Sequence, residues 1–139
     1  MRHLLILLTV LAPPSSAFGA GVEAYIQWSD FLAGYGHEVL IRDTTVVHIH
    51  RRAGERTPDW NVSVLDASEI DAFVDKLAAL GADNWAQRYP DQPNICDGLS
   101  YFIDVEAPTL SINTEGGCVF PPRFDEMLDA TKKLVKFRD

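Results

Sequence analysis

The sequence predicts an α+β domain of two layers, in which an antiparallel sheet of about five to six strands carries two helices packed on one face. Three observations favour this class. Segments of strand-like alternation fill the first half of the chain, a helix follows them, and a β-hairpin then leads to a second helix. No helices separate the strands of the first half, which favours antiparallel pairing.

Four short strands are expected before the first helix. Residues 22–28 and 60–64 alternate between apolar and polar side chains, which is the period of a half-buried strand. Residues 38–42 and 45–51 are β-branched and apolar, and Asp43-Thr44 between them fits the turn of a tight hairpin. The glycine- and proline-containing segments between these strands are expected to be loops.

Two helices are expected, and the first has clear ends. Asp66–Leu80 repeats apolar residues at helical spacing, and Asp66 with Glu69 forms a capping-box pair at its start. Gly81 stands where a C-terminal cap belongs. The second helix is expected from about residue 121 to residue 137, with acidic residues near its start and lysines near its end, as the helix dipole favours.

The two cysteines are expected to clamp the C-terminal hairpin. Residues 99–105 and 109–113 are typical of strands, joined by Glu106-Ala107-Pro108. Cys96 and Cys118 are symmetric about this turn, and antiparallel strands place such residues opposite each other. Two cysteines allow a single intramolecular pairing, so a Cys96–Cys118 disulfide is predicted. The sequence contains no CxxC motif, which would have indicated a redox thiol.

Residues 1–17 have the features of a secretory signal peptide. A basic residue precedes a short apolar run, and small residues follow. Ser15 and Ala17 suit the −3 and −1 positions of a cleavage site, and a cut after Gly19 fits nearly as well. The apolar run is far shorter than the roughly 20 residues of a membrane-spanning helix. Residues 18–139 are therefore expected to form a single domain that is periplasmic or secreted.

Composition excludes two further classes of function. The chain has 139 residues, of which 47% are hydrophobic, so a largely disordered protein is excluded. Twelve Lys and Arg stand against twenty Asp and Glu, for a net charge of −8. This acidic balance argues against nucleic-acid binding, which needs a basic surface, and against an electrostatic hold on anionic lipid.

Three histidines are candidate metal ligands. His48 and His50 are two apart on an expected strand, so their side chains point to the same face and could bind one metal ion. His37 is a candidate third ligand. The alternative is that both histidines lie on a solvent-exposed face while Val47 and Ile49 occupy the buried side.

Two further groups of residues are candidates for binding. A basic cluster could bind an acidic partner or a small anion. Alternatively, its residues lie on an edge strand and loop that are exposed to solvent. Aromatic residues in two loops could bind a protein or sugar, or could plug the end of the core. The candidate binding residues are Phe31, Tyr35, Trp85, Tyr89, Arg51 and Arg52, and the wider basic cluster includes His48, His50 and Arg56.

The C-terminal half resembles small exported bacterial α+β proteins. The matching pattern is Trp85…Tyr89, then Asp97-Gly98-x-x-Tyr101-x-Ile103-x-Val105, and finally Pro121-Pro122-x-Phe124-x-x-Met127-Leu128. A similar strand and proline-led helix occur in the emfourin family. This resemblance implies an inhibitor of thermolysin-like metalloproteases. It assigns no contact residue, and Gly34 and Gly36 are the candidates for a glycine-rich segment.

No nucleophile elbow, phosphate loop, HExxH or dinucleotide motif is present in the sequence. The sequence therefore favours an exported, soluble, non-catalytic binding module, such as a hydrolase inhibitor or an immunity-type protein. Its expected partner is a protein of the cell envelope or exterior. No cofactor, nucleic acid or membrane association is expected after signal removal. The alternative is a small enzyme or metal-binding envelope protein that uses His37, His48 and His50.

Overall fold

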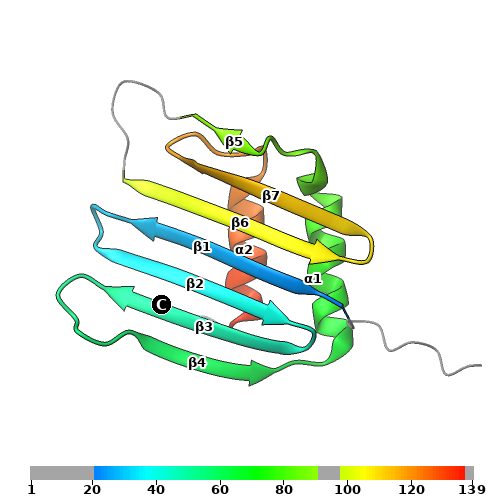
Figure 1. Ribbon diagram of the computed structural model, residues 1–139, viewed down its shortest axis with the longest axis horizontal. Helices are drawn as coiled ribbons and strands as arrows, with labels where there is room; N and C mark the ends of the chain where they lie inside the picture. Colours follow the sequence, from blue (N-terminus) through cyan, green and yellow to red (C-terminus); the bar gives the residue numbers. More distant parts are fainter. Residues whose placement is uncertain (1–20, 91–97, 137–139) are drawn as a thin grey trace, which may run out of the picture.

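The computed structural model describes residues 21–90 and 98–136. In these residues the chain forms one mixed sheet and two α-helices (Figure 1). The strands lie in the order β4-β3-β2-β1-β6-β7-β5. Their bounds are β1 Glu23–Asp30, β2 Tyr35–Arg42, β3 Thr45–Arg52, β4 Asp59–Val64, β5 Arg88–Tyr89, β6 Leu99–Ala107 and β7 Leu110–Gly117.

The α+β class is correct, but the predicted sheet was too small. The described residues contain seven strands, and β5 pairs with β7 in parallel. The prediction missed β5 because its two residues, Arg88 and Tyr89, are too few to show a strand period. It also shortened β2, which already begins at Tyr35, inside the glycine-containing segment that was expected to be a loop.

Both helices lie behind the sheet in the view of Figure 1, so the sheet has a helix-side face and an open face. Helix α1 (Ala67–Ala79) begins after Asp66 with the predicted capping box, and Gly81 follows its C-cap with a φ of 71°. Helix α2 (Phe124–Leu134) is shorter at both ends than the predicted helix. A short 3₁₀ helix, Ala82–Asn84, follows α1.

The core lies between the helix-side face and the helices. Alternate residues of the central strands are buried there, with Ile26 and Ile103 fully buried. Phe73 and Leu77 of α1 and Met127 of α2 are buried in the same cluster. The alternation of the strands thus places one row of apolar side chains under the helices.

The β6–β7 hairpin has a different turn from the one predicted. Ala107 pairs with Leu110, so Pro108-Thr109 is the turn, and the register is continuous to Ser100↔Gly117. The symmetry argument for the cysteines assumed a hairpin centred on Ala107, whereas the register is centred between Pro108 and Thr109. Cys118 accordingly lies beside Leu99, to whose carbonyl its backbone N–H donates at 3.2 Å. Cys96 lies outside the described residues, and the disulfide with Cys118 stays a prediction.

Candidate functional site

Three histidines of the neighbouring strands β2 and β3 lie together on the helix-side face. His37 on β2 is opposite both Trp28 on β1 and His50 on β3. The His37 ring stacks on Trp28 with ring centroids 4.7 Å apart and on His50 at 4.4 Å. Nδ1 of His37 lies 3.1 Å from Nε2 of His48, which is the distance of a hydrogen bond. We call His37, His48 and His50 the histidine row.

The alternative with His48 and His50 on an exposed face was wrong. The Asp43-Thr44 turn sets the register of β2 with β3, so Ile41 pairs with Val46 and His37 with His50. Val46 is buried, and His48 and His50 share its face. Val47 and Ile49 therefore point to the open face, the reverse of the assignment in that alternative.

A cavity of about 510 Å³ adjoins the histidine row near the last turn of α2. Its wall includes His37, His50 and three other polar or charged side chains, Tyr35, Arg52 and Lys132. Burial, followed by the nearby His50, His48 and Lys132, lowers the pKa of His37 from 6.5 to about 3. Burial and His50 also lower the pKa of His48. His37 is therefore a neutral imidazole at neutral pH.

Neutral imidazoles are the form that binds metal ions. In the described part of the chain, however, no group of three or more His, Cys, Asp or Glu side chains is placed to hold one. The rings of His37 and His50 are stacked within 6° of parallel, so they do not converge on one point. A general acid for catalysis at neutral pH needs a pKa near that pH, which His37 does not have. Metal binding by His48 and His50 stays a prediction.

The turn between β1 and β2 presents two large apolar side chains to solvent. Phe31 and Leu32 are each 80% exposed. We call residues 31–34 the hairpin tip. Phe31 was a candidate binding residue, whereas Leu32 was overlooked; the signal for it was an apolar pair inside a glycine-containing loop.

Hydrogen bonds hold the hairpin tip in one conformation. The amide of Gly34 donates to the carbonyl of Asp30 at 2.8 Å, and the amide of Ala33 donates to the Asp30 carboxylate at 2.8 Å. The amide of Phe31 donates to the carbonyl of Gly98 at 3.1 Å, which joins the tip to the start of β6. Gly34 has a φ of 72°, a conformation that suits glycine. The two exposed side chains thus stand on an ordered turn.

The other candidate aromatics lie against the core. Tyr35, Trp85 and Tyr89 are half-buried and pack on the buried cluster. The Tyr89 hydroxyl accepts the amide of Ala86 at 3.2 Å. The Trp85 indole nitrogen is buried and has no hydrogen-bond partner among the described residues. Their positions fit the alternative that these aromatics plug the end of the core.

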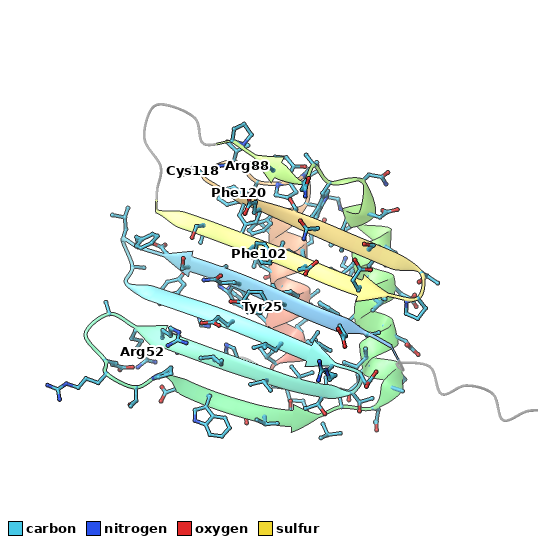
Figure 2. The ribbon with its side chains drawn as sticks, in the orientation of Figure 1. Tyr25, Arg52, Arg88, Phe102, Cys118 and Phe120 are labelled. Carbon is cyan, nitrogen blue, oxygen red and sulfur yellow. The ribbon has the colours of Figure 1, made fainter. Side chains whose placement is uncertain are left out.

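The basic cluster is divided between the two faces of the sheet. Arg51 is on the open face, where its Nε donates to the Glu38 carboxylate at 2.9 Å. Arg52 is at the end of β3 (Figure 2) and lines the cavity beside the histidine row. A strand alternates its side chains, so the two arginines leave β3 on opposite faces, although both also line a hollow at the end of the strand beside Gly34.

The open face has its own aromatic and apolar residues. Tyr25 on β1 and Phe102 on β6 face the viewer in Figure 2, with ring centroids 5.9 Å apart. The Tyr25 hydroxyl donates to Glu38 at 3.2 Å, and burial and the Glu38 charge raise the pKa of Tyr25. Toward β4 the face becomes apolar, with Trp60 70% exposed and Val64 75% exposed. The sequence interpretation did not single out these β4 residues.

Comparisons with known proteins do not place the chain in a family. No model of a known protein family matches the sequence, and no curated protein matches it. In the described residues neither helix is long and apolar enough to cross a membrane.

Proposed function

We propose that the chain is an exported, non-catalytic binding module that inserts its hairpin tip into a cleft of a protein partner. The observation that carries this proposal is the exposure of Phe31 and Leu32, at 80% each, on a turn held by hydrogen bonds. A turn whose backbone is already held by hydrogen bonds loses little backbone entropy on binding, which favours affinity. Large apolar anchors that enter a pocket supply most of the binding energy at many interfaces.

We further propose that the partner is a secreted or envelope hydrolase, which the chain inhibits or to which it confers immunity. The signal-like residues 1–17 support export. The resemblance to emfourin supports a thermolysin-like metalloprotease as the first enzyme to test. The neutral His37, with its pKa of about 3, supports a non-catalytic role for the histidine row.

The test uses the oxidised chain from residue 18 onward as an immobilised bait in secreted and envelope extract of its own source. A double variant, Phe31→Ser with Leu32→Ser, is the test variant. Val64→Thr is the matched control, since Val64 is 75% exposed on a different surface. Bound proteins are identified by mass spectrometry, and inhibition of thermolysin is measured in parallel with the same three proteins.

We expect one dominant hydrolase partner that the wild-type and Val64→Thr proteins retain. The double variant should bind it roughly 100-fold more weakly, at about 1.4 kcal/mol for each anchor. A partner that binds the double variant equally well would disprove the role of the hairpin tip. If no partner binds, calorimetry of zinc with the wild-type chain and with His48→Ala becomes the next measurement.

A further inference from the structure

The outer edge of β4 is open to pairing with another strand. In the described residues β4 pairs with β3 alone and stands at the end of the strand order. Natural edge strands commonly carry lysine, proline or a bulge that prevents pairing with other chains. Residues 59–64 contain neither Lys nor Pro, and their register with β3 runs uninterrupted from Thr45↔Val64 to His50↔Asp59.

The side chains of β4 on the open face are apolar. Trp60, Val62 and Val64 are 70%, 48% and 75% exposed. Val62 is opposite Val47, which in turn is opposite Leu40 on β2. An apolar row therefore crosses three strands and ends at the free edge. A row that ends in this way can be continued by the same row of an identical chain.

We propose that β4 pairs in antiparallel fashion with β4 of a second copy of this chain, about a two-fold axis that passes midway between the two Val62 residues. Antiparallel partners share a face, so a continuous sheet needs a register that keeps the apolar residues on one side. Pairing Val62 with Val62 of the second copy also places Trp60 opposite Val64. Every apolar residue of the strand then has an apolar partner. Centring the axis on Asn61 or Ser63 would place Val64 opposite Pro58 or Trp60 opposite Asp66.

Charges at the two ends of β4 complement this arrangement. Arg56 is exposed in the loop that precedes the strand. Asp66 and Glu69 are exposed where α1 begins after it. Antiparallel pairing brings the loop of one copy to the helix start of the other, so Arg56 comes near these carboxylates at both ends of the interface. Glu55 of the same loop is brought toward Glu69 as well, and its charge is offset within its own copy by Arg52 at 3.8 Å. β4 itself carries one charge, Asp59, at its first residue.

Single-cysteine variants test the register directly. In the proposed dimer the two Val62 Cα atoms are about 5 Å apart, within disulfide range. The two copies of Asn61, and likewise those of Ser63, are more than about 7 Å apart and cannot be bridged. Under mild oxidation Val62→Cys should form an interchain disulfide about tenfold faster than Asn61→Cys or Ser63→Cys. The wild-type protein, which keeps Cys96 and Cys118, is the control for exchange with the native cysteines.

Analytical ultracentrifugation of the oxidised chain from residue 18 onward tests the dimer itself. The wild-type protein should change from monomer to dimer as its concentration rises. Val62→Lys, which puts two like charges opposite each other on the axis, should remain monomeric. Leu32→Lys places the same charge on the hairpin tip and should dimerise like the wild type. Far-UV circular dichroism confirms that each variant is folded.

Two results would overturn the proposed dimer, and a third would overturn its register. One is a wild-type protein that stays monomeric at every concentration, which would leave the edge for a strand of a different protein. The other is a dimer that persists in Val62→Lys, since its interface would then lie elsewhere. Equal cross-linking of the three cysteine variants would disprove the register and with it the two-fold axis.

Discussion

His37 acquires its properties from residues on three strands and a helix. Trp28 and His50 stack on its two ring faces, Tyr35 approaches its edge, and His48 meets Nδ1. The side chain is 4% exposed, and Lys132 of α2 adds a positive charge nearby. Water is excluded and the other charges are unfavourable, so a proton on His37 is costly.

The stability of the protein should consequently fall in mild acid. In the unfolded chain His37 takes up a proton below pH 6.5, whereas in the folded chain it does so only near pH 3. The free energy of unfolding should therefore decrease as the pH falls from about 7, by about 2 kcal/mol at pH 5 from this residue. Urea unfolding between pH 7 and pH 5 measures the loss. His37→Phe, which keeps a flat ring but cannot titrate, should reduce the slope, and an unchanged slope would contradict this account.

The proximity of the three histidines was only partly predictable. The spacing of His48 and His50 correctly places them on one face of a strand, and His37 was considered as a third member. Their face was misjudged because the strand has apolar residues on both sides, Val47 and Ile49 on one and Val46 on the other. Alternation alone cannot show which face of such a strand is buried. The Asp43-Thr44 turn could have decided it, since it sets His37 opposite His50.

Among the elements, α1 followed its sequence most closely. Capping, helical period and the closing glycine act within a few residues of one another, so they can be read locally. The β6–β7 hairpin agreed less well with its sequence pattern, although both of its strands were predicted. Placing the turn at Glu106-Ala107-Pro108 ended the first strand too early and began the second one residue too early, whereas the actual turn is Pro108-Thr109. The position of a turn depends on how two strands pair, and the alternation along one strand carries no information about that pairing.

Close packing among β5, β6 and β7 makes Gly116 a sensitive position. A Cβ atom there would lie 2.5 Å from the Tyr101 hydroxyl and 2.9 Å from the carbonyl oxygen of Tyr89. The Tyr101 hydroxyl donates to the carbonyl of Val119 at 2.9 Å, which limits its movement. Gly116→Ala should therefore destabilise the protein by about 1–3 kcal/mol.

Thermal or urea unfolding measures this loss, and Gly36→Ala is the matched control. A Cβ atom at Gly36 would meet nothing closer than 3.5 Å, and the residue needs no left-handed backbone. The control should change the free energy of unfolding far less. Equal effects of the two substitutions would show that Gly116 is not constrained by its neighbours.

On the scale of the whole molecule, the sheet has two different faces. One lies under the helices and contains the core and the histidine row, and the other carries Tyr25, Phe102 and the apolar residues near β4. Composition and alternation were sufficient to predict an α+β class. They did not reveal which apolar residues stay exposed, because both rows of β3 contain valine and the apolar row of β4 lies on the open face and not in the core.

The predicted disulfide would affect the stability of the whole molecule, since it would close the C-terminal hairpin. A bond between Cys96 and Cys118 closes a loop of about 23 residues and should stabilise the fold by about 3 kcal/mol. The double variant Cys96→Ser with Cys118→Ser should unfold at correspondingly lower urea concentration. A reducing agent should lower the stability of the wild type to that of the variant. If reduction leaves the wild type unchanged, the cysteines are not paired.

The strand order also has a consequence for biosynthesis. Within the first half of the sheet, β1 to β4 are joined to one another only through neighbours in sequence, so residues 23–64 can assemble as a meander while the ribosome is still making the rest of the chain. Of the described strands β1 is made first, yet it becomes the middle of the sheet and lacks its second neighbour until β6 is made. A nascent chain therefore exposes two pairing edges at once, those of β1 and β4, until residues 99–107 are made and β6 covers the edge of β1.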